Sequence, residues 1–508
     1  MVLEHHYKNK TMKILNNKKT ISALLLATVM FAACDDNLDN LPISEGVSQN
    51  SYETGDQLEA ALTGVYESFQ GNDFYVWDHV LFSDVRSDND YAGGDNPEIF
   101  QLENINVEPT NERVYKAWSA IYNAIAKANV ILEQAPNVQK LLTNERREQI
   151  LGEAYFLRAY HYYSLVRLYG GVPLVLETVK SADPNVTRVE RSTEQDTYNQ
   201  IIADLAIAAD KLPATYGGDA SVNKARATKG AAHALLAKVY AQQPVPDYGQ
   251  VINYANLVMT SAAGYDLMGS FTELFDGSHY NNIESILEIQ FTGGNEGTWG
   301  PQMQLPPSVS GDTWRKFVTP SHDLVNAFDT EGDNIRKDAT ILFENVGWVD
   351  EFWGNASGSS VPFSYKWKNA MGWNSSDHVY LLRLADIILL KAEAHNELGQ
   401  TGLAEQEVNK IRLRVNLPVL TAEQTSSQIS MRKVILNERR LELAQEAHRW
   451  DDLVRSGNVV EVMNAVQDID LRTGKSVNYN MQEFEILLPI PQKELNRNPK
   501  LERNPGYN

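Results

Sequence analysis

The chain has 508 residues, of which 43% are hydrophobic and 22% charged, so it can bury a large core. Its formal net charge of −21 argues against nucleic acid or anionic lipid headgroups as the main partner. It contains a single cysteine, Cys34, so no intramolecular disulfide forms in any compartment.

Residues 1–33 have the features of a lipoprotein signal peptide. Lysines precede an apolar run at 21–31, which is shorter than the roughly 20 residues that span a bilayer but suits a signal-peptide core. The sequence FAAC at 31–34 resembles a lipobox, so we expect cleavage before Cys34 and lipidation of its thiol. Loss of this leader, with its net charge of +4, would change the total from −21 to −25. Translation is expected to start at Met1 or Met12, and residues 34–50 are expected to form a flexible tether.

Amphipathic helices are predicted through most of the segment that follows. Apolar residues repeat at helical spacing from about Thr54 to Phe69 and again in five later segments. These later segments are 117–134, 144–170, 194–212, 226–241 and 248–261. Residues 71–113 are predicted to be a loop region, because their carboxylates, amides and aromatic residues are too dense for a core.

Three predicted helices share a pair of small residues seven positions apart, followed three positions later by Tyr or His. The pairs are Gly152 with Ala159, Gly230 with Ala237, and Ala385 with Ala392. Small residues at this spacing lie on one face of a helix and let a neighbouring helix approach closely. The repeat predicts antiparallel helical hairpins, stacked as in a tetratricopeptide solenoid.

The sequence changes character between about 265 and 379. Glycine becomes frequent, and six of the nine tryptophans lie between Trp299 and Trp373. A strand is predicted at 284–291, and short strands or strand-loop segments are predicted at 334–343 and 364–369. Helices follow at 383–402, with Gly399 closing the first, at 402–415, and as one long helix at 431–457. The sequence thus predicts a mainly α fold, whose tetratricopeptide-like scaffold carries an irregular, loop-rich α+β insertion.

Five stretches resemble the SusD/RagB family of outer-membrane lipoproteins, and they occur in the family's order. The stretches are 152–175, 226–241, 383–394, 435–457 and 487–507. The resemblance implies a SusD-like domain at 51–508, with its scaffold at about 51–70, 114–262 and 380–457, a loop-rich subdomain with the recognition loops at 265–379, and a mixed tail at 458–508. It also implies a lipid anchor at Cys34 in the outer membrane, facing the cell exterior, and a SusC-like TonB-dependent transporter as partner.

Motifs for cofactor or metal chemistry are missing from the sequence. It contains no phosphate-binding loop, dinucleotide fingerprint or zinc-helix motif, so we expect no cofactor. Asp84, Asp88 and Asp90 do not have EF-hand spacing, so they are expected to lie in a solvated loop and to hold no metal. Glu446 and His448 fall within the family's helical motif, where we expect packing and not catalysis.

Aromatic residues in polar loops are typical of sugar-binding proteins. Sugar rings have apolar faces and a rim of hydroxyls, so their sites combine flat aromatic surfaces with carboxylates, amides and arginine. We expect tryptophans to stack on the ligand and polar residues to bind its hydroxyls. The candidate ligand-binding residues are Trp77, Asp84, Arg86, Asn89, Tyr91, Asn295, Trp299 and Trp314.

The expected function is capture of oligosaccharide or polysaccharide at the cell surface, without catalysis, and delivery to the transporter. One alternative is a peptide-capturing lipoprotein, because the RagB branch of the family handles peptides. A secreted polysaccharide hydrolase is a second alternative, and it would need two carboxylates held across the scissile bond. A helical-repeat adaptor is disfavoured because it would not need the tryptophan-rich insertion.

Overall fold

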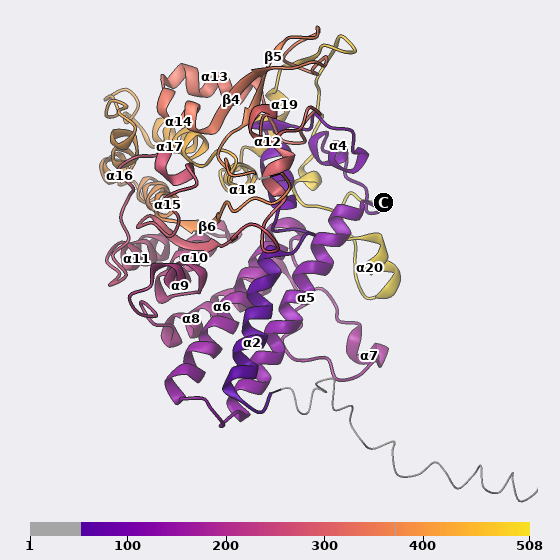
Figure 1. Ribbon diagram of the computed structural model, residues 1–508, viewed down its shortest axis with the longest axis vertical. Coiled ribbons are helices and arrows are strands. Elements are labelled where there is room, and N and C mark those ends of the chain that lie inside the picture. Colours follow the sequence, from indigo (N-terminus) through magenta and orange to yellow (C-terminus); the bar gives the residue numbers. More distant parts are fainter. Residues whose placement is uncertain (1–51, 371, 508) are drawn as a thin grey trace, which may run out of the picture. The chain divides into compact units, whose positions relative to one another are not determined.

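The computed structural model describes residues 52–370 and 372–507, so the signal peptide, Cys34 and the tether predicted at 34–50 lie outside the described residues. From Thr54 onwards the chain forms one compact unit. This unit is mainly helical, as predicted (Figure 1). Within the described ranges, none of the helices is both long and apolar enough to cross a membrane.

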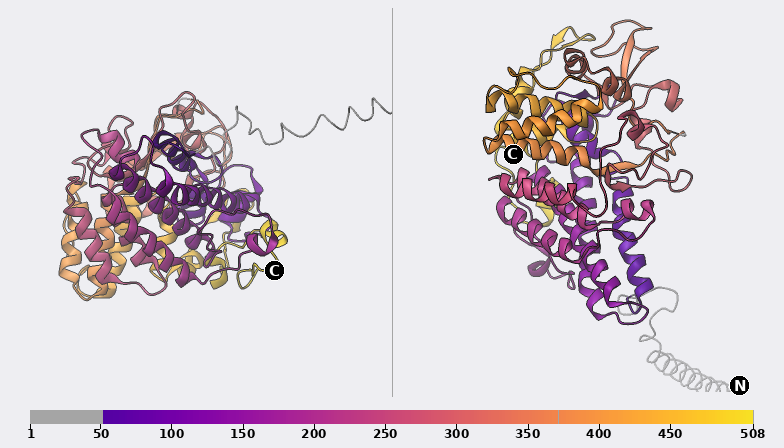
Figure 2. Two further views of the ribbon diagram at one scale, coloured as in Figure 1. Left: turned by 90° about the horizontal axis from the view of Figure 1, so that it is seen from below. Right: turned by 90° about the vertical axis from the view of Figure 1, so that its left-hand side faces the viewer.

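Antiparallel helices form the scaffold. These helices are α2 (Gly55–Tyr66), α5 (Glu112–Gln134), α6 (Asn144–Tyr169), α8 (Glu194–Lys211), α10 (Lys229–Gln242), α11 (Tyr248–Met259), α15 (Leu384–Glu397), α16 (Thr401–Arg414) and α17 (Gln428–Leu443). α6 packs against α5 and α8, α10 against α11, and α15 against α16, while α8–α10 and α11–α15 contacts join the hairpins in series. The right-hand view of Figure 2 shows this stack, which confirms the predicted helical-hairpin scaffold.

The small residues of the sequence repeat lie in tightly packed parts of the interior. Ala159, Ala237 and Ala392 are completely buried. A Cβ atom added to Gly230 would lie 2.5 Å from the ring of Tyr265, so a larger residue does not fit there. The repeat therefore predicted a real packing constraint.

Side-chain caps fix where the scaffold helices begin. Thr54 forms a capping box with Gln57 at the start of α2, and Thr143, Thr193 and Thr228 each accept a hydrogen bond from the first turn of α6, α8 and α10. Such caps contribute about 1 kcal/mol each.

Shorter elements make up the remainder of the unit. The short helices are α3 (Asp78–Val80), α4 (Pro97–Glu103), α7 (Pro184–Thr187), α9 (Ala220–Ala225), α12 (Pro307–Ser310), α13 (His322–Glu331), α14 (Asn334–Thr340), α18 (Arg449–Arg455), α19 (Val459–Ala465) and α20 (Gln492–Arg497). Four antiparallel strand pairs are β1 (Asp90–Tyr91) with β3 (Thr319–Pro320), β2 (Ser285–Ile289) with β6 (Val379–Arg383), β4 (Ile341–Asn345) with β5 (Ser360–Ser364), and β7 (Ile469–Asp470) with β8 (Lys475–Ser476). The region 265–379 thus has the irregular α+β character that was predicted.

One of the strand predictions in this region was wrong in its bounds. The segment 334–343 begins as helix α14, because the Asp333 carboxylate caps it by accepting a hydrogen bond from the Arg336 backbone N–H. Strand β4 starts only at Ile341. In the segment 364–369 only Ser364 belongs to a strand, since β5 ends there and a loop follows, which is the second of the two predicted alternatives.

The single helix predicted at 431–457 is in fact two helices. α17 ends at Leu443 and α18 begins at Arg449. Between them Gln445 and Ala447 have φ angles of 63° and 62°, which cannot continue a right-handed helix. Periodicity alone did not reveal this break because the apolar pattern continues across it.

The prediction of a solvated loop at 71–113 was wrong for its central part. All residues from Val80 to Gly93 are buried, and they form a π-helical turn over Leu81–Val85 followed by β1. A polar segment can lie in the interior only if its charges and hydrogen-bonding groups have partners. These partners come from the end of α17, from α18 and from the segment between them.

Candidate functional site

Trp77 lies in the core, with 1% of its surface exposed. Its ring meets the rings of Trp299 and Phe317 edge-on at centroid distances of 5.7 and 5.6 Å, and the Arg113 guanidinium lies 5.0 Å from its centre. Trp77 therefore offers no stacking surface to a sugar in this structure, contrary to our expectation. Its contact with Trp299 instead supports that residue from the inside.

Asp84 and Asn89 are buried, and both form hydrogen bonds with residues of the segment 440–447. The Asp84 carboxylate accepts hydrogen bonds from the Ala447 backbone N–H at 2.7 Å and from the Asn89 amide at 3.3 Å. Burial raises the pKa of Asp84 to about 7. The amide oxygen of Asn89 accepts a hydrogen bond from Nε of Arg440 at 2.8 Å. Both side chains are occupied by the protein itself and are not available to a ligand.

Arg86 and Tyr91 are likewise internal. The Arg86 guanidinium lies 4.0 Å from the centre of the Trp450 ring and donates a hydrogen bond to the backbone carbonyl of Glu485. The Tyr91 hydroxyl donates to the Asp350 carboxylate at 2.6 Å. The expectation that these residues bind hydroxyls of a ligand is therefore corrected: they join the segment 84–91 to later parts of the chain.

Asp88 is held by two arginines, which explains why an acidic segment can be buried. Arg449 forms a bidentate pair with its carboxylate at 2.8 Å for both bonds, and Arg440 lies at 3.1 Å. Burial alone would raise the pKa of Asp88, but Arg440 and Arg449 hold it well below its usual range. Across the described ranges, no group of three or more acidic, His or Cys side chains could hold a metal ion.

Trp299, Trp314 and Trp373 belong to one row of aromatic side chains, in which ring contacts run from Trp299 through Trp77, Phe317 and Trp314 to Trp373. Trp299 packs on Trp77, and its indole N–H donates to the side-chain oxygen of Asn72 at 2.7 Å. The ring of Trp314 packs on that of Phe317, with 5.8 Å between their centroids. These residues come from three different loops of the irregular insertion, so the fold itself assembles the row.

Trp373 is the most exposed tryptophan of this row, with 49% of its surface accessible. Its ring lies nearly parallel to that of Trp314, with an interplanar angle of 23° and 6.2 Å between centroids. The Lys316 ammonium lies 3.8 Å from the centre of the Trp314 ring. Trp314 therefore acts as a support, with its ring engaged by Trp373 and Lys316, and Trp373 presents the free aromatic surface. Trp373 was not among the residues predicted from the sequence, although its position between Gly372 and Asn374 is typical of an exposed loop.

Backbone contacts hold the Trp373 loop against the loop that carries Trp299. Thr298 and Ser375 exchange two backbone hydrogen bonds, of 2.9 and 2.8 Å. Glycines allow this approach: a Cβ atom on Gly297 would lie 1.9 Å from the Asn374 side chain, and one on Gly300 would lie 2.4 Å from the carbonyl oxygen of Val76. The aromatic row is thus positioned by close packing of its loops.

A groove of about 870 Å³ lies beside this row. One wall comes from the end of α2 and from α5, and the other from β2 and the loop 291–297. Asn295 and Glu296 are exposed on this loop, and Asn72, which binds the indole of Trp299, also lines the groove. We name the surface formed by the groove, Trp299 and Trp373 the aromatic face. Of the eight candidate residues, Asn295 and Trp299 belong to this face, and Trp314 lies behind it in contact with Trp373.

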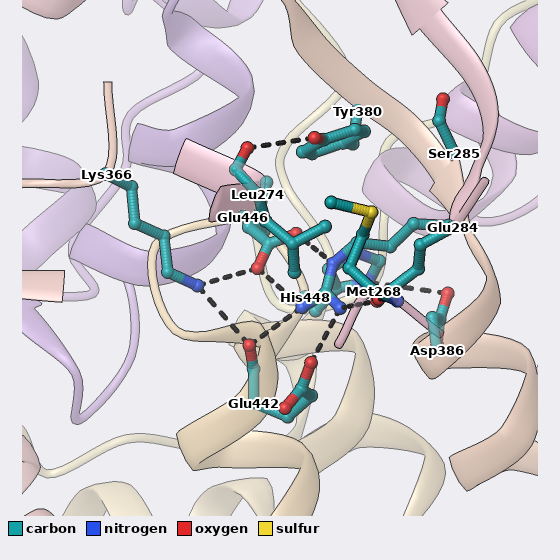
Figure 3. A network of polar contacts seen from close by, with 12 residues as sticks. Met268, Leu274, Glu284, Ser285, Lys366, Tyr380, Asp386, Glu442, Glu446 and His448 are labelled. Atoms are coloured by element: carbon teal, nitrogen blue, oxygen red, sulfur yellow. Dashed lines mark hydrogen bonds and ion pairs between the residues drawn. The ribbon is translucent and has the colours of Figure 1, made fainter. Parts of the chain in front are cut away.

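A separate set of charged residues lies in the interior, and Figure 3 shows it from close by. Arg383 binds Glu446 at 2.6 Å, Glu442 at 2.7 Å and Glu284 at 2.9 Å, and Lys366 binds Glu446 at 2.6 Å. Each of these side chains is at least 98% buried. The network fixes β6 against α17, which agrees with the packing role expected for Glu446.

The comparisons with known proteins agree with this fold. Two family models match the chain: the SusD family over residues 350–507, and a family described as starch-binding and associating with the outer membrane over residues 36–241. The chain belongs to the SusD/RagB family, as its helical motifs indicated.

Individual relatives match over most of their length. A SusD-like protein P38 of Formosa agariphila is 26% identical, with 98% of this chain and 100% of that protein covered. The crystal structure of a SusD superfamily protein from Bacteroides vulgatus has a TM-score of 0.76 at 21% identity and covers 90% of this chain and 100% of its own. A laminarin-binding SusD-like protein has a TM-score of 0.73 at 27% identity, again with 90% and 100% covered.

Proposed function

We propose that this protein captures glycan chains on the aromatic face and has no catalytic role there. The observation that carries the proposal is the half-exposed ring of Trp373, which is backed by Trp314 and whose loop pairs with Thr298, next to the residue Gly297 that lines the groove. An indole ring of this kind packs well on the apolar face of a sugar, and hydrogen-bonding side chains at its edge satisfy the hydroxyls. The name of the laminarin-binding relative supports the same class of ligand.

Polar groups on the aromatic face are available to a ligand. The amide of Asn295 is exposed and makes no hydrogen bond to other described residues. Glu296 is also exposed, and its carboxylate is bound on one side by the Thr292 hydroxyl at 2.9 Å. Trp299 and Trp373 would thus provide apolar surface, and Asn295 and Glu296 would bind sugar hydroxyls.

We further propose that the protein is anchored in the outer membrane and faces the cell exterior. Residues 1–33 would be the leader, Cys34 the lipidated residue, 34–50 the tether and 51–508 the ligand-binding domain. The captured glycan would pass to a SusC-like TonB-dependent transporter. The family description that mentions outer-membrane association supports this location.

The Trp373→Ala variant tests glycan capture directly. Loss of a main stacking surface should cost about 2 kcal/mol, or roughly thirtyfold in affinity, without a change in the unfolding midpoint. The measurement is calorimetric titration with the polysaccharide that binds wild type most tightly in a panel of laminarin, starch, xylan and galactomannan. Leu413→Ala is the control, because Leu413 is an exposed apolar residue on α16 that does not line the groove. Unchanged affinity of Trp373→Ala would exclude this site, and binding of a mixed peptide digest in place of glycans would favour the peptide-capturing alternative.

The anchor is tested by the Cys34→Ala variant. Without the thiol, no diacylglycerol can be attached, so the variant lacks the acyl chains that durable membrane anchoring needs. The variant should lose metabolic fatty-acid label and move to the soluble fraction. A labelled variant that stays in the outer-membrane fraction would contradict the proposed anchor.

A further inference from the structure

A second cavity, which we name the α13 pocket, has a volume of about 370 Å³. It lies between β1, the first turns of α13, Phe352 and the segment 462–479. Its volume falls within the range of roughly 300–1,000 Å³ that is typical of small-molecule sites. The pocket shares no lining residue with the groove of the aromatic face.

One side of the α13 pocket is aromatic. Tyr91, Phe352 and Tyr479 line it, and the rings of Tyr91 and Phe352 pack edge-to-face at 4.6 Å. His322, at the start of α13, packs on Trp353 with 3.9 Å between ring centroids. These contacts fix the aromatic side, so the pocket is formed before any ligand binds.

The other side carries hydrogen-bonding groups that the protein leaves unused. The amides of Asn326 and Gln467 are exposed and bind no other described residue. Asp90, which is 2% exposed, also lines the pocket, and its Oδ2 has no hydrogen-bond partner among the described residues. An unpaired buried carboxylate oxygen is costly, so a donor that reaches it would be favoured.

Charge in the pocket disfavours an anionic ligand. Four carboxylates line it, and His322 is the one potentially cationic side chain among the described lining residues. His322 is bound to Asp468 at 2.9 Å, and Asp88 is already paired with Arg449. Hydrogen-bond acceptors in the pocket lining therefore outnumber donors. Such a lining suits the neutral hydroxyl groups of a sugar and not the anionic groups of a uronate or a sulfated sugar.

The α13 pocket and the aromatic face lie at the two ends of one short segment. Trp314 supports Trp373 at one end, and His322 lines the pocket at the other. His322 follows Trp314 by eight residues, which in extended conformation span at most about 28 Å, so the Cα atoms of Trp314 and His322 are no further apart than this. A single glycan of several sugar units is long enough to contact both places.

We propose that the α13 pocket is a second subsite that binds a neutral sugar unit of the same glycan chain held at Trp373. This inference rests on the proposed function of the aromatic face. Two weak subsites on one chain raise the overall affinity for long ligands, because binding of the second is intramolecular. Short oligosaccharides gain nothing from the pair.

The test uses the Asn326→Ala/Gln467→Ala double variant, whose exposed side chains support no part of the fold. Its ligands are the polysaccharide selected from the panel of laminarin, starch, xylan and galactomannan, and the corresponding trisaccharide. We expect at least tenfold weaker binding of the polysaccharide and less than twofold change for the trisaccharide. Asn253→Ala/Gln406→Ala, with exposed side chains on α11 and α16, is the matched control and should bind both ligands as wild type does.

A second variant, Phe352→Ala, removes the aromatic side and should weaken polysaccharide binding in the same way at an unchanged trisaccharide affinity. If wild type binds no polysaccharide, both the proposed function and the second subsite are refuted. If Trp373→Ala weakens binding but the double variant binds the polysaccharide as wild type does, only the second subsite is refuted. Equal wild-type affinity for polysaccharide and trisaccharide would refute it as well.

Discussion

Arg383→Met should be among the most destabilising substitutions in the protein. Arg383 is the last residue of β6, and its guanidinium donates to Glu284, Glu442 and Glu446. Methionine fills a similar volume without the charge. The variant therefore leaves three buried carboxylates with one cation fewer, while the remaining packing is kept.

The magnitude follows from the burial of this network. Removing one partner of a buried ion pair costs about 3–5 kcal/mol, because the other partner stays uncompensated in the interior. Arg414 still binds Glu284 at 2.6 Å, and Lys366 still binds Glu446, so the three carboxylates are not left without any cation. We therefore expect a loss of about 3–5 kcal/mol and not a multiple of it. The total free energy of unfolding of a native domain is only about 5–15 kcal/mol.

Urea unfolding followed by circular dichroism measures this loss. Arg432→Met is the matched control, because Arg432 also forms a bidentate pair with a glutamate, Glu397, but is half exposed. Exposed pairs contribute about 0–1 kcal/mol, so the control should stay close to wild type. Equal midpoints for the two arginine variants would refute the argument that burial decides the cost.

Two further predictions concern the candidate site and the dependence of stability on pH. Gly300→Ala should displace its loop from Val76 and weaken glycan binding, because the new Cβ would lie 2.4 Å from a backbone oxygen. Gly64→Ala is the control: it lies in α2 with open space around it and should stabilise the fold by about 0.5–1 kcal/mol. Wild-type glycan affinity of Gly300→Ala would contradict the assignment of the aromatic face as the glycan site. Burial, and then Glu351, raise the pKa of Glu103 to about 8. The fold therefore favours the neutral Glu103 carboxyl. Its contribution to the free energy of unfolding is fully present below the unfolded-state pKa of about 4.3 and is lost as the pH rises towards 8. Glu103→Gln should therefore gain at least about 1 kcal/mol relative to wild type between pH 5 and pH 8 in urea unfolding, and a parallel pH profile would show that Glu103 is ionised in the folded state.

The sequence predicted the scaffold well because its helices are long and carry strong local signals. The three pairs of small residues, the threonine caps and Gly399, whose φ is 74°, all act within a few residues of the position they specify. Local patterns of this kind can be recognised without knowledge of the tertiary structure. The helix break at 444–448 was missed because its cause is a tertiary contact, the hydrogen bond from Ala447 to Asp84.

The candidate site was predicted only in part, for a related reason. Asn295 and Trp299 were selected because they lie in a glycine-rich loop, and the structure places this loop at the groove; their role in binding stays a prediction. The segment 77–91 has a similar composition, but Arg440 and Arg449 neutralise it from more than 350 positions away, which composition cannot show. Trp373 was not selected, because its contact with Trp314 is a tertiary contact that composition cannot show.

The pairing of Asp88 with Arg449 also has a consequence for how the chain folds. The two residues are 361 positions apart, so the early segment cannot reach its buried position until nearly the whole chain exists. At about 5–20 residues per second, the ribosome needs roughly 20–70 seconds to make the intervening chain. Contacts of such long range also slow folding itself. The segment 80–93, which depends on these late arginines, cannot take up its buried conformation in the meantime. This order would suit the export proposed above, in which the chain passes through a membrane before its core is complete.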